Sequence, residues 1–343
     1  MNIPAFLNTV GTRAYSLPIV ILYVTAGCNL KCVMCSYRDP LPNELSLDEI
    51  KKLAGELSAL GLKHIVYSGG EPLLRRDLPA ICELFKSFNI KQSLLTNGLL
   101  LEKRYPELTS FFHEIIVSLD GPSAGLHNEI RGIEAFEQIC KGIRSITSSI
   151  SRPALSLRTV IQRKNFRDIG AMVELAKSLG VDRISFLSAD VSSSAFHRET
   201  TGDVANQNEI ALNIEETDVF RSLMGTFIGR YQSEIERGFI SESPQKLYHI
   251  VQYFEALVNK APFPRNKCNA PMVSSVITST GEFLPCYFLP SVGNIRTTDI
   301  KSLLNNYQLR STRKNVKDYS LERCHECVCT LTVSPASALM DRF

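Results

Sequence analysis

The chain has 343 residues, of which 44% are hydrophobic and 21% are charged, and its formal net charge is only +3. This composition is ordinary for a globular protein, and so small a charge gives no sign of a nucleic-acid partner or of an anionic membrane surface. The longest apolar run near the N-terminus, residues 18–24, is far shorter than the roughly 20 residues that cross a bilayer. We therefore expect a cytoplasmic protein with no membrane insertion.

Short β-branched runs alternate with amphipathic stretches of helical period over residues 18–190, a pattern typical of parallel βα units. One intervening helix has readable ends, because Ser46 and Glu49 form a capping box and Gly61 closes the helix. Six such units predict an α/β fold with a partial (β/α)6 barrel of the TIM type. The six predicted strands are 19–24, 64–68, 92–96, 114–119, 154–161 and 183–188.

The chain after the predicted barrel divides into two further parts. Residues 191–261 are expected to form a polar loop and a helical bridge, with helices at about 215–238 and 244–260. Ser243 and Pro244 suit the cap and first turn of the second helix. Residues 262–343 break into short segments rich in proline and cysteine, which favours a small module held together by metal.

Eight of the ten cysteines form two tight groups at opposite ends of the chain, which favours metal binding over a disulfide scaffold. The first group is a C-x3-C-x2-C motif directly after the first predicted strand. Three thiolates on one loop leave one iron of a [4Fe–4S] cluster without a protein ligand. Structural zinc normally takes four ligands, and no histidine in the loop supplies the fourth, so zinc fits less well. The three cysteines are Cys28, Cys32 and Cys35.

Three successive predicted strands run into polar or glycine-rich motifs. In an α/β barrel the functional site lies at the carboxyl ends of the strands, so these motifs are expected to converge. Each alone is most often a turn, but their order behind the cysteine loop indicates a ligand site. A glycine pair lets the backbone approach a ligand, and a glutamate suits an ammonium group. The motifs are Ser68-Gly69-Gly70-Glu71, Thr96-Asn97-Gly98 and Ser118-Leu119-Asp120-Gly121.

The cysteine loop and these ordered strand ends resemble the radical S-adenosylmethionine (SAM) superfamily over roughly residues 18–190. The resemblance implies that the open iron chelates the amino and carboxylate groups of SAM. One electron then cleaves SAM to methionine and a 5′-deoxyadenosyl radical. One departure is Met34, where the family usually has an aromatic residue. The implied SAM contacts are Ser68, Gly69, Gly70 and Glu71 to the amine, Thr96, Asn97, Ser118 and Asp120 near the ribose, and Arg158 to the carboxylate.

The segment 120–132 resembles one found in superfamily members that carry C-terminal auxiliary clusters. Its His127 and Arg131 are four residues apart and can share one side of a helical turn. We expect both to face the mouth of the active site and to contact substrate, with a surface role as the alternative. For Arg158 the alternative is a solvent-facing arginine.

Five cysteines follow residue 260 and make up the second group. The C-x12-G-x4-C spacing that opens it resembles the SPASM module and its shorter form, twitch, both of which follow radical SAM barrels. A full SPASM module has more cysteines, so this region looks twitch-like, and a zinc ribbon is the alternative. Cys329 either replaces Cys327 or stays a free thiol. The predicted ligands of an auxiliary [4Fe–4S] cluster are Cys268, Cys286, Cys324 and Cys327.

The predicted function is that of a radical SAM enzyme of oxidoreductase type acting on a small biosynthetic molecule, such as a cofactor, a pigment or tetrapyrrole, or an aminosugar. A four-cysteine cluster has no open iron and suits the passage of an electron, which favours a net oxidation such as dehydrogenation or hydroxylation. A flavodoxin- or ferredoxin-type protein is the expected electron donor. Peptide maturation is the runner-up. A non-catalytic iron–sulfur carrier or a zinc-binding protein is the alternative from another class, although a carrier needs no SAM site.

Overall fold

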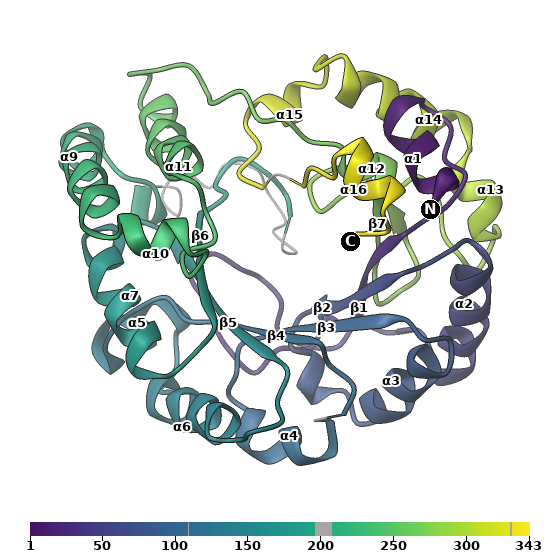
Figure 1. Ribbon diagram of the computed structural model, residues 1–343, viewed down its shortest axis with the longest axis horizontal. Coiled ribbons are helices and arrows are strands. Elements are labelled where there is room, and N and C mark those ends of the chain that lie inside the picture. The colour runs from purple at the N-terminus through teal and green to yellow at the C-terminus, as the bar shows by residue number, and fades with distance from the viewer. Residues whose placement is uncertain (109, 196–207, 330) are drawn as a thin grey trace.

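The computed structural model describes residues 1–108, 110–195, 208–329 and 331–343. Six parallel strands form an arc, and helices α2 to α7 cover its outer side (Figure 1). The predicted strands and the partial barrel are confirmed, with each strand end within one residue of its predicted place. The strands are β1 (Ile19–Thr25), β2 (His64–Gly69), β3 (Lys91–Thr96), β4 (Glu114–Ser118), β5 (Ala154–Ile161) and β6 (Arg183–Ser188).

Capping residues define the ends of the first helix between the strands. The capping box is confirmed, because Ser46 Oγ accepts from the Glu49 N–H while Glu49 Oε2 accepts from the Ser46 N–H. Gly61, just past the end of this helix, has a φ of 77°. The helices are α2 (Leu47–Ala59), α3 (Leu78–Ser87), α4 (Leu101–Leu108), α5 (Ala124–Arg131), α6 (Phe136–Thr147) and α7 (Ile169–Ser178), with short 3-10 turns at Pro72–Leu74 and Phe166–Asp168.

The helical bridge lies beside β6. It comprises α9 (Ile214–Arg230), α10 (Gln232–Glu236) and α11 (Pro244–Leu257), so the first predicted helix is divided at Tyr231. Ser243 caps α11 as predicted, since its hydroxyl accepts from the Lys246 N–H. Part of the predicted loop 191–212, residues 196–207, lies outside the described residues.

The C-terminal region shares the sheet of the barrel. Strand β7 pairs in parallel with β1, and β8 pairs antiparallel with β7, giving the order β6-β5-β4-β3-β2-β1-β7-β8. The predicted C-terminal module does follow the barrel, and its strands β7 and β8 extend the same sheet, which the sequence did not predict. The elements are α12 (Ala270–Val273), β7 (Ser274–Ile277), β8 (Phe283–Leu284), α13 (Ile300–Leu304), α14 (Tyr307–Lys317), α15 (Glu322–His325) and α16 (Pro335–Leu339).

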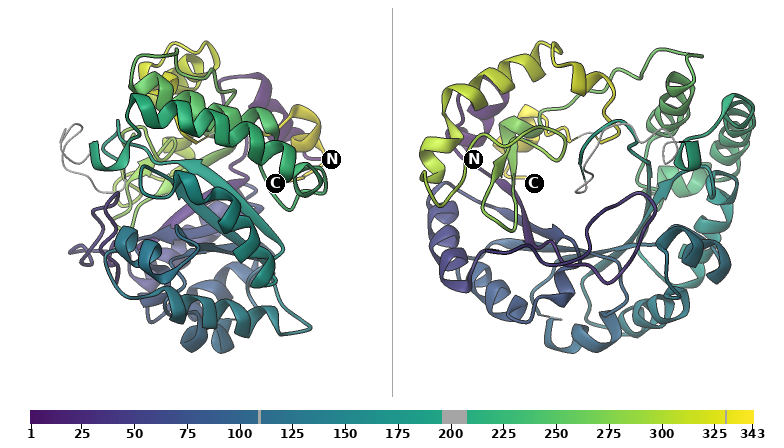
Figure 2. Two further views of the ribbon diagram at one scale, coloured as in Figure 1. Left: turned by 90° about the vertical axis from the view of Figure 1, so that its left-hand side faces the viewer. Right: turned by 180° about the vertical axis from the view of Figure 1, so that it is seen from behind.

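The two faces of β1 serve two cores. Val20, Leu22 and Val24 point outward into the main core beneath the helices. Ile19 and Ile21 point inward and pack with residues of the C-terminal region, so that region fills the barrel interior beside β1. Figure 2 shows the C-terminal segments lying across the open side of the arc.

The two ends of the chain lie side by side (Figures 1 and 2). An unpredicted helix, α1 (Ile3–Val10), packs on α16, and the Asn2 N–H donates to the Leu339 carbonyl at 2.8 Å. Among the described helices, none combines the length and the apolar character needed to cross a bilayer.

Helix α5 docks end-on against the loop that carries the first three cysteines. The Lys31 N–H donates to the Arg131 carbonyl at 3.0 Å and the Val33 N–H donates to the Ile130 carbonyl at 3.1 Å. Gly132 ends the helix with a φ of 74°, and a Cβ there would lie 2.3 Å from the Lys31 carbonyl oxygen. This contact therefore admits only glycine.

We expect Gly132→Ala to lower the free energy of unfolding by about 1–3 kcal/mol, because alanine is strained at this φ and its Cβ meets a backbone oxygen. Gly125→Ala in the same helix is the matched control, since no atom lies within 4 Å of an added Cβ. It should leave stability unchanged or slightly raised. Urea unfolding of both variants measures the difference, and equal losses would contradict the account.

Candidate functional site

The first three cysteines lie on a loop, residues 26–46, that leaves β1 and packs against the end of β2. The Gly70 N–H donates to the Thr25 carbonyl at 2.8 Å, and the Glu71 N–H donates to the Gly27 carbonyl at 2.7 Å. A Cβ at Gly70 would lie 2.2 Å from the Gly27 oxygen. The predicted glycine pair is thus required where two backbone segments meet, which fixes the cysteine loop to the sheet.

The three cysteines lie close together on this loop, since Cys32 contributes to a raised pKa of Cys28, and Cys28 and Cys32 contribute to a raised pKa of Cys35. Burial raises the pKa of Cys28, and it raises the pKa of Cys35 to about 11. Two donors point at the sulfurs: Asn97 Nδ2 is 3.9 Å from Cys28 Sγ, and an Arg131 terminal nitrogen is 3.6 Å from Cys32 Sγ. Such donors stabilise metal-bound thiolates, so the residues present fit a cluster held by three cysteines.

The described residues contain no group of three or more His, Cys, Asp or Glu side chains placed to bind a single metal ion. Each thiolate of a [4Fe–4S] cluster binds a different iron, so its cysteines stand farther apart than the ligands of one ion.

Glu71 is fully buried, and its carboxylate connects two strand ends. It accepts hydrogen bonds from the Leu73 N–H at 3.0 Å, from Thr96 Oγ1 at 2.7 Å and from the Asn97 N–H at 2.7 Å. Burial raises its pKa to about 7 despite these bonds. Asn97 in turn donates to Asn29 Oδ1 at 2.8 Å. The Glu71 side chain therefore positions the β3 end against the cysteine loop.

The two predicted serines stand at the same edge of the arc. Ser68 is the last residue but one of β2 and lies opposite Tyr23, and Ser118 ends β4 opposite Arg158. Both are half-buried, whereas Glu71 and Thr96 are buried. The structure thus brings the predicted strand ends together beside the cysteine loop, with Ser68 and Ser118 the more accessible side chains.

Asp120 and Arg131 form a buried ion pair, with Asp120 Oδ2 2.6 Å from an Arg131 terminal nitrogen. The other Asp120 oxygen accepts from the Val160 N–H at 2.8 Å. Burial raises the pKa of Asp120, and Arg131 opposes that rise. Burial alone would lower the pKa of Arg131. The negative charges of Asp120 and Cys32 have the larger effect, and the pKa of Arg131 is raised. This pair connects β4, β5, α5 and the cysteine loop.

His127 is fully buried beside this pair. Its Nδ1 accepts from the Asp120 N–H at 3.3 Å, and its ring packs on Phe136. Burial lowers its pKa to about 3, so the ring is neutral. A surface role, the alternative for His127 and Arg131, is wrong, since both side chains are inside the protein.

One cavity in the C-terminal region is lined by all five cysteines of the second group. The Cys268 sulfur interacts electrostatically with each of the other four and accepts from the Ala270 N–H at 3.4 Å. Burial raises the pKa of each of those four, to about 12 for Cys286. The four predicted ligands therefore lie close together, and Cys329 lines the same cavity. The five residues are Cys268, Cys286, Cys324, Cys327 and Cys329.

Three tyrosines lie between the two cysteine groups, and the sequence analysis missed them. The Tyr23 ring is 6.2 Å from the Tyr37 ring and 6.2 Å from the Tyr287 ring, measured between centroids. Tyr23 also interacts electrostatically with both Cys35 and Cys286. Burial raises the pKa of all three phenols, which are therefore neutral. Their position in the sequence could have identified two of these tyrosines, because Tyr37 and Tyr287 closely follow cysteines of the two groups.

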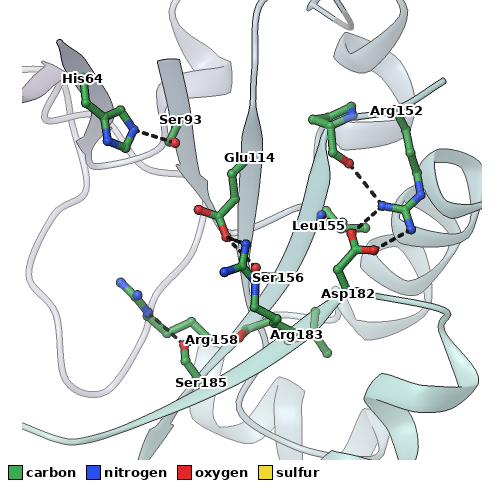
Figure 3. A network of polar contacts seen from close by, with 12 residues as sticks. His64, Ser93, Glu114, Arg152, Leu155, Ser156, Arg158, Asp182, Arg183 and Ser185 are labelled. Atoms are coloured by element: carbon green, nitrogen blue, oxygen red, sulfur yellow. Dashed lines mark hydrogen bonds and ion pairs between the residues drawn. The ribbon is translucent and has the colours of Figure 1, made fainter. Parts of the chain in front are cut away.

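Arg158 projects from β5 into the barrel interior, and its Nε donates to Ser185 Oγ at 3.3 Å. Figure 3 shows its guanidinium extending past Ser185, on a face of the sheet that also carries the His64–Ser93 and Glu114–Arg183 contacts. Arg158 lines a cavity together with Cys327 and Cys329. The structure thus groups Arg158 with the second set of cysteines.

Two family models match the chain. A radical SAM superfamily model matches residues 22–186, and a model of an iron–sulfur cluster-binding domain, SPASM, matches residues 268–328. The first range contains the C-x3-C-x2-C loop, and the second contains the four predicted auxiliary ligands. These matches favour iron–sulfur clusters over zinc at both cysteine groups.

Three curated relatives illustrate the range of similar proteins. The Fe-coproporphyrin III synthase of Methanosarcina barkeri is 28% identical over 66% of this chain and 54% of its own length. The AdoMet-dependent heme synthase of the same organism is 28% identical over 83% of this chain and 81% of its own length. The subtilosin biosynthesis protein AlbA of Bacillus subtilis is 27% identical over 88% of this chain and 62% of its own length. This chain thus spans less than two thirds of two of these relatives.

Solved structures share the fold. The structure of anSMEcpe with bound AdoMet has a TM-score of 0.66 at 18% identity and covers 91% of this chain and 89% of its own. Streptococcus suis SuiB bound to its precursor peptide SuiA has a TM-score of 0.64 at 16% identity and covers 93% of this chain and 72% of its own. With both family models, both cysteine groups and the partial barrel in agreement, this chain belongs to the radical SAM superfamily as an enzyme that binds SAM and [4Fe–4S] clusters and has a C-terminal SPASM region.

Proposed function

We propose that this enzyme abstracts a hydrogen atom from a small biosynthetic molecule of the tetrapyrrole class and oxidises it. The main support is the similarity to the heme synthase, which extends over 83% of this chain and 81% of that protein. When bound, the first cluster supplies the electron that divides SAM into methionine and a 5′-deoxyadenosyl radical. The chain's own residues bind, orient and shield the reactants.

Cys28, Cys32 and Cys35 hold the first cluster in this proposal. The backbone of Gly69 and Gly70, with Ser68 and Ser118, lines the adjoining SAM site. Because the Glu71 carboxylate is occupied by Leu73, Thr96 and Asn97, we assign it a positioning role in place of direct contact with the amine. Asp120, His127 and Arg131 likewise support the loop from within the protein.

The three tyrosines between the two cysteine groups suit a flat substrate. The rings of Tyr23, Tyr37 and Tyr287 lie next to one another, and aromatic faces pack well against planar rings. A substrate held there lies beside the SAM site on one side and the SPASM cysteines on the other. Removal of a hydrogen atom and then of one electron is a two-electron oxidation, and the second cluster is the proposed acceptor of that electron.

A flavodoxin- or ferredoxin-type protein is the proposed donor of the electron that cleaves SAM.

Peptide maturation is the second candidate function, and the similarity to AlbA over 88% of this chain favours it.

The direct test supplies wild-type enzyme with SAM, a low-potential reductant and iron-coproporphyrin III. We expect 5′-deoxyadenosine together with an oxidised tetrapyrrole, both measured by mass spectrometry. Cys28→Ser should abolish both products, because the cluster loses a ligand, whereas Cys82→Ser in the core of α3 should keep them. Deoxyadenosine formed beside an unchanged tetrapyrrole would reject this substrate class.

The ion pair gives a stability prediction. Arg131→Met should cost about 3–5 kcal/mol of unfolding free energy, because it leaves Asp120 buried without its partner. Adding Asp120→Asn should recover part of that loss, since the uncompensated charge is removed. Urea unfolding of the two single variants and the double variant measures the coupling, and purely additive effects would contradict it.

The electron-acceptor role of the second cluster has its own test. The double variant Cys268→Ala, Cys286→Ala should still cleave SAM, because the first cysteine group is intact, while the oxidised product should fall sharply. Iron analysis must show loss of the second cluster. Unchanged product from such a variant would exclude the acceptor role.

A further inference from the structure

A second cavity opens where β5, β6, α11 and the SPASM cysteines meet. Its wall combines the apolar side chains of Phe186, Leu187 and Ile250 with polar groups from three separate parts of the chain. The acidic and basic side chains among them are Arg158, Glu242, Lys246 and His249, with Cys327 and Cys329 at the C-terminal side.

The two cations of this cavity, Arg158 and Lys246, form no close ion pair with the described residues. Across the described ranges, neither Arg158 nor Lys246 lies within 4 Å of a carboxylate oxygen, although other basic side chains of the protein form such pairs. Arg158 is half-buried, where an unpaired charge is costly. The only carboxyl group in the cavity wall among the described residues is Glu242, which accepts from the Phe186 N–H at 2.9 Å.

Glu242 compensates these cations only in part. Burial raises its pKa to about 7, against the opposing effects of the Phe186 N–H, Arg158 and Lys246, so at neutral pH the group is only partly charged. His249 is engaged through Nδ1 with Asn266 Oδ1 at 3.3 Å. Among the charged side chains of the cavity wall that the structure describes, the two basic ones therefore outnumber the acidic one, which favours an anion as the ligand.

We propose that Arg158 and Lys246 bind a carboxylate of the substrate in this cavity. A guanidinium matches a carboxylate in two hydrogen bonds, and a lysine at the open rim adds a second charge. This inference rests on the proposed function and deepens it, because propionate side chains are what distinguish a coproporphyrin from an uncharged ring.

The position of the cavity favours a substrate carboxylate over that of SAM. Arg158 lies opposite Ser118, at the border of the proposed SAM site, but the cavity extends from there toward Lys246 on α11 and the second cysteine group. Both cations interact electrostatically with Cys329. Arg158 also interacts with Tyr287, one of the three tyrosines between the cysteine groups. A carboxylate bound here directs the rest of its molecule toward those rings.

The test measures equilibrium binding to the reconstituted full chain with no reductant present. Two probes are used: iron-coproporphyrin III followed by its visible absorbance, and citrate followed by calorimetry. We expect Arg158→Met and Lys246→Met each to weaken binding of both probes by about tenfold or more. The affinity for SAM should not change.

Two matched variants serve as controls. Arg183→Met removes an exposed arginine of β6 that pairs with Glu114, and Lys260→Met removes an exposed lysine that pairs with Asp218. Neither residue lines the cavity, so both variants should bind the probes like the wild type. Iron content and circular dichroism show that each variant is folded and loaded.

The outcomes separate the carboxylate site from the substrate class. If citrate binds in a way that depends on Arg158 but the porphyrin does not bind, the carboxylate site is supported and the tetrapyrrole is excluded as the substrate class. Binding of both probes that is equal in wild type and cavity variants overturns the site, and so does failure of the wild type to bind either probe. A loss of SAM affinity in Arg158→Met assigns the arginine to SAM and also overturns it.

Discussion

The ion pair between Asp120 and Arg131 is the interaction on which the site depends. It joins the chain just after β4 to the end of α5 and, through the Arg131 carbonyl and guanidinium, to the cysteine loop at Lys31 and Cys32. Two charges are expensive to bury, and an apolar pair would pack as well. In the proposed function Cys32 is a cluster ligand, and the cation beside it would stabilise its thiolate. Asp120 compensates the buried charge of Arg131, so the cation can lie beside Cys32 inside the protein.

Much of the barrel could be predicted because its signals are local. Apolar runs with polar or glycine ends predicted all six parallel strands within a residue at each end. The pairing of β7 with β1 was missed, because the four residues Ser274–Ile277 carry no sign of a partner some 250 positions earlier. Helix α1 was missed for a related reason, since eight residues gain their stability from contact with α16. Contacts distant in sequence account for both failures.

The features of the site also divide into those that local sequence predicts and those that depend on contacts between distant parts of the chain. The two cysteine groups were visible in the sequence, because ligand spacing within one loop is a local property. The role of Glu71 was not, since its hydrogen bonds to Thr96 and Asn97 exist only once β2 and β3 are adjacent. The same holds for Tyr23, which reads as one more aromatic residue of a buried strand until the C-terminal region places Tyr287 beside it. The spacing of His127 and Arg131 predicted that both side chains lie on one face of a helix. It did not predict that this face is buried.

The pairing of β7 with β1 has a consequence for how the enzyme can be divided. A fragment that stops before residue 262 lacks β7 and leaves β1 as an edge strand, with unpaired backbone groups and with Ile19 and Ile21 exposed. Such an edge is a template for aggregation. The SPASM region, for its part, would lose the strand on which its own short sheet is built. The boundary between two family models therefore runs through one sheet, and the radical SAM half of this chain is not a module that can be expressed or exchanged by itself.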